Sequence, residues 1–537
     1  MTIQPSLVTV QAHSSLLNIC WDPEFSTRRD LCYKSENESY LKSIADWESE
    51  SPVGSPGWLS DLENAIRGFM RGPDQSDSCT PEADIVLAFC HKSTFKQLLG
   101  ETEAIYSSLP QNAWLDERHF REGKVQARTQ RGALTARELY NALNAPRFFL
   151  CRECLIESCE ADSQSGTMAS TQNSAYATVD ALLDEGDPKQ PDAERRLIFV
   201  TDPDGWVIHA LIGTASRLQA YALRDILYRH LAAQTFIGVT FVLAGYRMFE
   251  LAFHLPYYAW RDAEAQIEDH RQDSNGRPMR QSHDVSFLNW QNDGQLSFIH
   301  QAQTSCVVAG TDIWRWVGYC FVESYFDCGN EARETVMTYI EEGESGGLFM
   351  DPCTYGCFPL EDNIKDPREW FLLVFQCRLH QIRTEWRQVV RNVAQSVQNY
   401  EVPERSYALT RQRTSRYFRG DKEQRKEMQK LVQWAVDARR LLTLLSPCLT
   451  RTVDACDKFC LESATYFLDV PGASTINMSF CALRSIFDDL KSMKKTLEDT
   501  AHSCNCFSQN LELRLGNDQR ELAKENNWMG YVVMVSL

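Results

Sequence analysis

The chain has 537 residues, 43% of them hydrophobic, and a formal net charge of −18 at pH 7. Single hydrophobic cores seldom grow beyond ~250–300 residues, so this length predicts several domains. The excess of negative charge argues against nonspecific binding of nucleic acid, whose phosphates it would repel, and it suits cations.

The composition also bears on the cellular compartment. The first residues, MTIQPSLVTV, lack the basic and apolar regions of a secretory signal, and the 19 cysteines are an odd number. No apolar run approaches the ~20 residues that a membrane helix needs. We therefore expect a cytoplasmic protein with mostly reduced thiols and no membrane span, with a membrane-peripheral location as the alternative.

The front of the chain is the least informative part. Residues 1–159 mix short apolar pieces with polar loops and form a poorly defined N-terminal region. Residues 160–195 are polar, acidic and almost free of aromatic side chains. Such a segment cannot bury enough apolar surface to offset its ordering entropy, so we predict a disordered acidic linker.

Regular structure is predicted from residue 196 onwards. Arg196–Thr201 is a candidate buried strand, and Asp202 and Asp204 are candidate capping residues of a helix that runs to about residue 232. Further strands are predicted at 236–243, at 249–255, where apolar residues alternate with Glu250, Ala252 and His254, and at 299–308. Residues 312–325 form a Trp-rich element whose Trp314 and Trp316 would share one strand face. Together, residues 196–360 are expected to form one α/β domain.

The C-terminal part is dominated by long helices. Asp366 and Pro367 are N-cap and first-turn residues for a helix over 366–400, and a basic linker is expected at 401–420. A helical stalk should follow over 421–525, with a middle helix to about residue 463 that bends at Pro447, a final helix over roughly 476–515, and a short tail at 526–537. The predicted fold class is therefore α+β: a mixed α/β domain with a small sheet, then long helices forming a bundle or a funnel-like stalk.

Apolar residues in two of these helices keep a heptad spacing. The first set is Phe375, Leu379, Ile382, Trp386, Val389 and Val393; the second is Phe480, Leu483, Phe487, Leu490, Leu497, Ala501 and Cys504, with Lys494 as an interruption. A heptad seam keeps one face toward a neighbouring helix, and an unpaired seam would expose apolar surface. We therefore expect a homo-oligomer formed through the long helices, or a helical protein partner.

Several strings between residues 192 and 379 resemble fungal CorA-like proteins, relatives of the CorA divalent-cation transporters. They are DAERRLIFVTDPDGW, HALIGTAS and ALRDILYRHLA (192–232), FELAFHLPYYAWR (249–261), DVSFL (284–288), CVVAGTDIWRWVGYCFVESYF (306–326), MDP (350–352) and DPREWFLLVFQCRL (366–379). The resemblance extends to about residue 519 and implies a cytosolic α/β domain, long helices forming a funnel, a pentamer, and two membrane helices with a Gly-Met-Asn signature.

The chain departs from that family pattern at its end. After Asn526, Asn527 and Trp528 only GYVVMVSL remains, so both membrane helices and the signature are missing from this sequence. The family resemblance therefore predicts the cytosolic part of a CorA-like protein without its pore.

Few residues suggest a site. Asp488 and Asp489 are the metal candidates, because CorA transporters sense Mg²⁺ through carboxylates between the cytosolic domain and the long helix; a solvated helix face is the alternative. Cys151, Cys154 and Cys159 resemble half of a zinc site, but the second half is missing, so incidental thiols are the alternative that we favour. The remaining close pairs of thiols are Cys353/Cys357, Cys456/Cys460 and Cys504/Cys506. Acid, base and nucleophile candidates do not cluster, so no enzyme and no cofactor beyond a regulatory Mg²⁺ is predicted.

Two functions remain open from the sequence. The first is a CorA-like protein related to divalent metal-ion (Mg²⁺) transporters. The alternative is a soluble helical scaffold or adaptor that has lost transport. The Arg-rich stretch at 405–419 could contact anionic lipid headgroups, although a solvated connector is the commoner fate of such a run.

Overall fold

The structure is a computed structural model. It describes residues 21–29, 36–43, 62–71, 81–100, 109–121, 124–149, 191–243, 247–289, 296–327, 334–360, 364–414, 422–468 and 474–535. Most of the expected acidic linker, the hairpin connection after residue 243 and the candidate zinc cysteines Cys151, Cys154 and Cys159 lie outside these residues.

One eight-stranded mixed sheet organises the front of the molecule. Its order is β2-β1-β3-β8-β7-β5-β4, with β6 paired to β7. The strands are β1 (Ala113–Arg121), β2 (Lys124–Leu134), β3 (Arg195–Thr201), β4 (Phe236–Leu243), β5 (Arg247–Ala263), β6 (Ser282–Asp284), β7 (Leu296–Gly310) and β8 (Trp316–Val322). Neighbours are antiparallel except for β3 and β8, which are parallel. With the long helices that follow, this sheet confirms the α+β class.

Short helices cover one face of the sheet. They are α3 (Leu62–Met70), α4 (Pro81–Phe89), α5 (Phe95–Leu99), α7 (Ala136–Leu143), α10 (Gly205–Thr214) and α11 (Arg217–Leu231). Their apolar residues form one buried core with the strands, in which Ile198, Val200 and Phe321 meet Leu211 and Leu223. Helix α12 (Val336–Gly346) packs against β2. We call the sheet with these helices the head.

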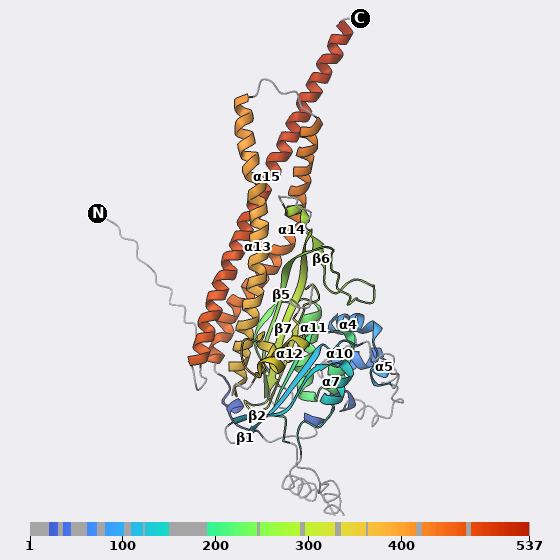
Figure 1. Ribbon diagram of the computed structural model, residues 1–537, viewed down its shortest axis with the longest axis vertical. Coiled ribbons are helices and arrows are strands. Elements are labelled where there is room, and N and C mark those ends of the chain that lie inside the picture. Colours follow the sequence, from blue (N-terminus) through green and yellow to red (C-terminus); the bar gives the residue numbers. More distant parts are fainter. Residues whose placement is uncertain are drawn as a thin grey trace, which may run out of the picture.

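Three long helices cover the other face and extend beyond it (Figure 1). They are α13 (Pro367–Thr414), α14 (Lys422–Lys458) and α15 (Ser474–Val535), which we call the stalk. Helices α13 and α14 pack on β5, and α15 packs along both of them. The C-terminal end of α15 runs past the ends of its two neighbours (Figure 1).

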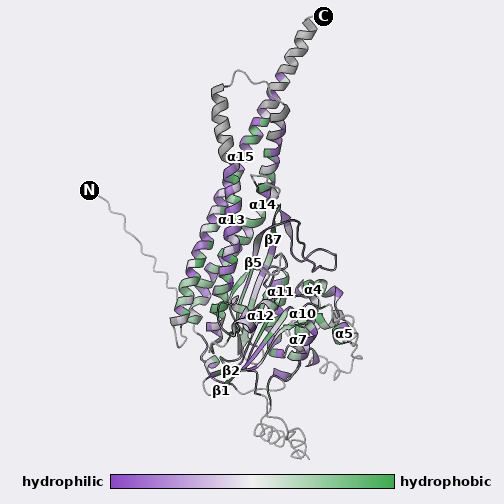
Figure 2. Ribbon diagram, viewed as in Figure 1, coloured by the Kyte–Doolittle hydropathy of each residue, from purple (hydrophilic) through white to green (hydrophobic). Residues whose placement is uncertain are grey.

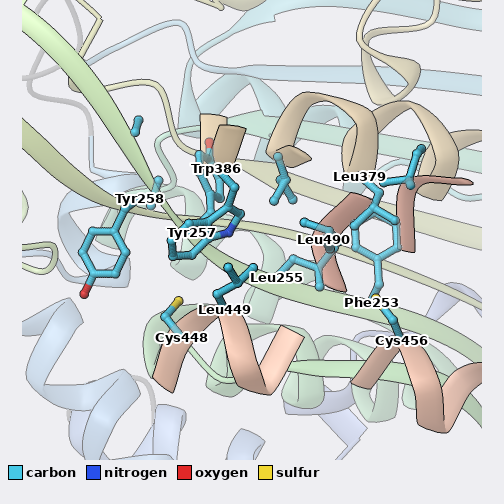
Figure 3. Packing of buried hydrophobic residues seen from close by; sticks show 14 of the residues in the cluster. Phe253, Leu255, Tyr257, Tyr258, Leu379, Trp386, Cys448, Leu449, Cys456 and Leu490 are labelled. Carbon is cyan, nitrogen blue, oxygen red and sulfur yellow. The ribbon is translucent and has the colours of Figure 1, made fainter. Parts of the chain in front are cut away.

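The alternating side chains of β5 connect the two layers. Phe249, Leu251, Phe253, Leu255 and Tyr257 belong to the core that faces the stalk. Figure 3 shows Phe253, Leu255, Tyr257 and Tyr258 of this strand among Leu379 and Trp386 of α13, Cys448, Leu449 and Cys456 of α14, and Leu490 of α15. Because a strand points successive side chains to opposite faces, the intervening residues of β5 lie under α11.

That second face of β5 differs from expectation. Alternation of apolar and polar residues is typical of a half-exposed strand, but His254 is fully buried and Glu250 is only 7% exposed. The Nε2 atom of His254 lies 3.3 Å from a carboxylate oxygen of Asp225 on α11. The predicted alternation of polar and apolar residues is present in β5. However, α11 covers the polar face of the strand, and alternation alone does not predict a covering helix.

Most predicted strands are present, with longer bounds in several cases. β3 and β4 match the predictions, and β5 and β7 extend the expected strands at both ends. The helix expected up to residue 232 is two helices, α10 and α11, because Ala215 has an extended backbone and Ser216 starts a new helix with a capping box involving Gln219. The side-chain oxygen of Gln219 accepts from the Ser216 N–H at 3.3 Å.

One further expectation was wrong, and one region contains strands for which we made no prediction. Strands β1 and β2 come from the region that we could not define, and β1 pairs with β3 in the sheet of the head. Trp314 precedes β8 and therefore does not share its strand with Trp316. The side chain of Asp312 accepts hydrogen bonds from the backbone N–H groups of Trp314 and Arg315, which bends the chain before the strand begins.

Helices α13 and α15 begin as expected and end later. Helix α13 starts at Pro367 and continues to Thr414, through part of the expected basic linker, and α15 continues to Val535, through most of the expected tail. Dispersed charges suit a solvated helix as well as a linker, so composition did not distinguish them. Helix α14 contains Pro447 and is followed by a π-helical turn at Phe459–Ser463; the expected bend at the proline stays a prediction.

The first heptad seam is buried within the chain. All six residues from Phe375 to Val393 in that set have zero exposure, and α13 packs against the sheet and α15. Most of the second seam is buried as well, including Leu483, Leu490 and Leu497. These seams therefore do not by themselves require a second chain, and self-association stays a prediction.

Hydrophilic and hydrophobic residues are interspersed along the stalk helices (Figure 2). Within the described residues, none of the helices combines the length and the apolar character that a bilayer crossing requires.

Candidate functional site: a cavity between head and stalk

A cavity of about 690 Å³ lies where the head meets α13 and α15. This volume is in the range of ~300–1,000 Å³ that is typical of small-molecule sites. The head contributes β5, the segment that follows β8, Glu334 before α12, and the loop around residue 357; the stalk contributes one face of α13 and three residues of α15. The lining includes Tyr257, Arg261, Asp327, Glu334, Tyr355, Cys357, Cys377, His380, Glu385 and Ile486.

Arg261 joins three elements at one side of the cavity. Its two terminal nitrogens each donate to Glu385 of α13 at 2.8 Å, and its Nε donates to Asp327 at 2.6 Å. Burial alone would lower the pKa of Arg261, but Glu385 and Asp327 raise it above its usual range. The guanidinium therefore stays charged and ties the end of β5 to the stalk.

Arg378 makes a second connection between α13 and the head. It is fully buried, and its guanidinium pairs with both carboxylate oxygens of Glu334, at 2.8 and 2.9 Å. It also donates to the carbonyl oxygens of Cys353, at 2.9 Å, and of Pro352. One α13 side chain thus holds both the segment before α12 and the loop that follows it.

A further buried ion cluster is centred on Glu323, which also lines the cavity. Glu323, directly after β8, accepts from Arg280 at 2.7 Å, lies 3.1 Å from Arg271, and contacts His230 of α11 at 3.3 Å. Burial would raise the pKa of Glu323, but Arg280 and Arg271 lower it well below its usual range. Burial lowers the pKa of His230 to about 4, so this imidazole is neutral at pH 7.

The charges of the cavity are thus largely satisfied by each other. Its carboxylates Asp327, Glu334 and Glu385 have arginine partners, which leaves little uncompensated negative charge for a bare cation. Tyrosine, glutamine, histidine and thiol groups complete the lining. Such a cavity can bind a small polar molecule through hydrogen bonds and aromatic contacts.

The two metal candidates lie nearby on the stalk surface, outside this cavity. Asp489 of α15 accepts from Arg383 at 3.0 Å and from Arg387 at 3.1 Å, both on α13, and its side chain is 41% exposed. Asp488 is exposed. Throughout the described residues, no group of three or more His, Cys, Asp or Glu side chains is arranged to hold a metal ion. A cation at Asp489 would compete with two guanidinium groups.

The two aspartates that we assigned to capping have different roles. Asp204 is the N-cap of α10 and accepts from the Val207 N–H at 2.9 Å, as predicted. Asp202 instead adopts a left-handed backbone and accepts from the N–H groups of Ser324, at 2.9 Å, and Tyr325, at 3.1 Å. It therefore shapes the segment that leaves β8 toward the cavity.

Sequence reasoning missed Arg261, Glu334 and Arg378 as residues of interest. Arg261 is the last residue of FELAFHLPYYAWR, and Arg378 lies inside the apolar string DPREWFLLVFQCRL. A charge inside an apolar run is the signal that could have singled out Arg378, since buried arginines are nearly always paired. Its partner, 44 residues away, could not be identified from spacing.

Comparison with known proteins gives little further information. No protein-family model matches the chain, and no curated protein matches it. Among solved structures, it is similar to the crystal structure of the ZntB cytoplasmic domain from Vibrio parahaemolyticus, with 8% identity, a TM-score of 0.29, and coverage of 60% of this chain and 91% of that one. An identity of 8% and a TM-score of 0.29 do not indicate a shared function.

Proposed function

We propose that this chain is the head-and-stalk part of a CorA-like protein that handles divalent cations. The observation that carries the proposal is where the resembling strings fall. They form β3, most of β5, β8 and the first turns of α13, which meet in one core between the sheet and the stalk. The resemblance thus follows a folded unit and not scattered surface segments.

The shape of the stalk supports the same proposal. Helix α15 has 62 residues and, at ~1.5 Å per residue, would reach roughly 90 Å. It leads away from the head and ends at the far tip of the molecule (Figure 1). A long helix in this position suits a module that transmits a change in the head along the stalk. We further propose a cytoplasmic location for this part.

The metal hypothesis is tested by the effect of Mg²⁺ on thermal unfolding. The full chain, freed of metal with a chelator, is heated with millimolar Mg²⁺ and, as the control, with Na⁺ at equal ionic strength. Binding to the folded state alone should raise the Tm, and above the Kd the rise should keep growing with the logarithm of the Mg²⁺ concentration. We expect a rise with Mg²⁺ that Asp488→Ala combined with Asp489→Ala removes.

A matched pair on the same helix serves as the control variant. Glu498 and Asp499 are adjacent, exposed acids ten residues further along α15. Glu498→Ala with Asp499→Ala should keep the Mg²⁺ response. Because Asp489→Ala also removes the pairs with Arg383 and Arg387, the compared quantity is the shift caused by Mg²⁺, not the Tm itself. Absence of a Mg²⁺ shift in the unaltered chain would contradict the proposed site.

A helical scaffold or adaptor is the second candidate, and one observation favours it. Leu513 and Trp528 of α15 are 67% and 71% exposed, toward the end of the helix that extends past α13 and α14. Exposed apolar side chains on a projecting helix suit contact with another helix. The partner that we propose is a second copy of this chain, and a measurement of mass in solution tests it as described in the Discussion.

A further inference from the structure

Two cysteines from different parts of the fold meet at the cavity. Cys357 lies in the loop after η5 (Pro352–Thr354), and Cys377 lies on α13, and both line the cavity. Cys357 is close enough to Cys377 to be among the causes that raise the pKa of the Cys377 thiol, and the ring of Tyr355, two residues before Cys357, lies against the guanidinium of Arg378, the neighbour of Cys377. This pair of cysteines therefore links the head to the stalk at a different place from the ion pairs of Arg261 and Arg378.

The two thiols differ in their access to solvent. Cys357 is exposed, whereas Cys377 is only 8% exposed. Burial, with the neighbouring Cys357 as a further cause, raises the pKa of Cys377 to about 12. A dissolved oxidant thus reaches Cys357 first, and Cys377 is placed behind it as a second thiol.

A nearby group of three cysteines provides a contrast. Cys306, Cys320 and Cys353 are fully buried, with Cys306 and Cys320 directly opposite each other on β7 and β8. Solvent does not reach them in the folded protein. Contact between thiols alone is thus not the distinguishing feature of the cavity pair; it is contact combined with one exposed sulfur.

The loop that carries Cys357 is held in place. Tyr355 and Gly356 have positive φ angles of 58° and 66°, which turn the chain sharply before Cys357. The Cys357 N–H donates to the Thr354 carbonyl at 3.2 Å, and the Asp351 N–H donates to the Phe358 carbonyl at 2.9 Å. Arg378, the neighbour of Cys377 on α13, donates to the Cys353 carbonyl at 2.9 Å. The two sulfurs are therefore kept together before any reaction.

We propose that Cys357 and Cys377 form a reversible disulfide when a peroxide oxidises the protein. The Cys357 thiolate attacks one peroxide oxygen, the O–O bond breaks, and the leaving oxygen departs as water once protonated. The Cys377 sulfur then attacks the resulting sulfenic acid, the S–O bond breaks, and a second water leaves. Two thiols and one hydrogen peroxide give one disulfide and two waters: the sulfurs lose two electrons and the peroxide gains them.

The bond would fix the cavity loop to α13. The chain segment that it closes runs from residue 357 to residue 377 and includes the start of the stalk. Closing a loop of this kind stabilises the folded state chiefly by restricting the unfolded chain. The oxidised protein should therefore unfold at a higher temperature than the reduced one, and a dithiol reductant should reverse the shift.

The experiment uses the full, reduced chain treated with hydrogen peroxide, after which remaining thiols are alkylated and the protein is digested with trypsin. Lys365 and Arg368 lie between the two cysteines, so the peptides 334–365 and 369–378 separate unless a disulfide joins them. The expected product is this joined pair of peptides. Because Cys353 shares the first peptide with Cys357, fragmentation in the mass spectrometer assigns the sulfur.

Variants decide between the proposed bond and unspecific oxidation. Cys357→Ser and Cys377→Ser should each abolish the joined peptides and the rise in Tm, whereas Cys506→Ser, which removes an exposed stalk thiol, should keep both. Cys377→Ala serves as a second variant if the serine at this mostly buried position prevents folding. A disulfide from Cys357 to another cysteine, or oxidation of Cys357 without a bond to Cys377, would overturn the proposal.

Discussion

Arg378 is the side chain on which the junction of head and stalk depends most directly. It is fully buried, and four of its contacts go to Glu334 and to the carbonyl oxygens of the cavity loop. Removing one partner of a buried ion pair leaves the other charge without compensation in a poorly solvated place. The penalty therefore comes from Glu334 and the orphaned carbonyls as much as from the lost attraction.

Arg378→Met should lower the free energy of unfolding by about 3–5 kcal/mol. Arg387→Met is the matched control on the same helix, since Arg387 is 55% exposed and pairs with a partly exposed carboxylate. Such surface pairs contribute about 0–1 kcal/mol, so the control should change little. Urea unfolding of the three proteins measures the difference, and equal effects of the two substitutions would contradict the assignment of Arg378.

Glu250 gives a second residue-scale prediction, which concerns pH. Burial, and then the neighbouring Asp225, raise the pKa of Glu250 to about 8, while Arg229 acts in the opposite direction. His254 faces the same group and is paired with Asp225. Because the folded state holds this proton more tightly than the unfolded state, Glu250 favours folding below pH 4.5, and this contribution is lost as the pH rises to about 8.

Glu250→Gln keeps the neutral shape at every pH. Relative to this variant, the unaltered protein should lose free energy of unfolding steadily between pH 4.5 and about pH 8. Glu264→Gln, at an exposed position beyond the end of β5, should show no such trend. Urea unfolding across this pH range is the measurement. A constant difference between Glu250→Gln and the unaltered protein would contradict the raised pKa.

At the scale of elements, the fit of α13 on β5 decides whether the stalk stays on the head. Trp386 has zero exposure, and its ring lies 6.0 Å from that of Tyr258 on β5, with the planes nearly perpendicular. On the same helix, the ring centroid of Phe375 lies 5.1 Å from that of Phe253. The heptad positions of α13 thus serve a contact between helix and sheet as well as contacts between helices.

Trp386→Ala should lower the free energy of unfolding by about 3–5 kcal/mol, because it opens a cavity that the surrounding elements cannot fill completely. Arg391→Ala, at an exposed position on the same helix, should stay within about 0.5 kcal/mol of the unaltered protein. Chemical unfolding followed by circular dichroism measures both. A small effect of Trp386→Ala would mean that α13 does not pack on the sheet in solution.

The start of α13 was predicted correctly because its capping signal lies within a few neighbouring residues. Pro367 with Asp366 marks the start of α13, and the Asp366 side chain accepts from the Arg368 N–H at 2.9 Å. The division between α10 and α11 was missed although Ser216 and Gln219 form a capping box, because the apolar pattern continues across it. The ends of α13 and α15 were missed because polar, charged helices and linkers have similar compositions.

For the whole molecule, the projecting end of α15 bears on whether the chain associates with a second copy of itself. In the part of α15 whose side chains the structure describes, Leu511 is the last buried apolar residue. A helix end without intrachain packing contributes little to the stability of a monomer, since isolated helices are marginal in water. In an oligomer joined through this end, the same residues would be buried between chains.

Removal of residues 520–537 separates these two cases. We expect the Tm of the truncated chain to match that of the full chain at low protein concentration, because Leu511 is the last buried apolar residue among the described side chains of α15. If the full chain self-associates through α15, its mass by light scattering should exceed that of one chain and fall to one chain on truncation. Trp528→Ala should weaken the association in the same direction. A full chain that is monomeric at all concentrations would contradict the proposed self-association.

Patterns among neighbouring residues were enough to predict the α+β class, the central strands, and the start and seam of the long helices, because hydrophobic period and capping residues act locally. Packing in three dimensions brings β1 and β2 into the sheet of the head, buries Glu250 and His254 under α11, and fills the α13 seam within one chain. It also decided which distant residues meet: Arg378 with Glu334, Arg261 with Glu385, and Cys357 with Cys377. Such contacts depend on how the layers pack, and no spacing along the chain encodes them.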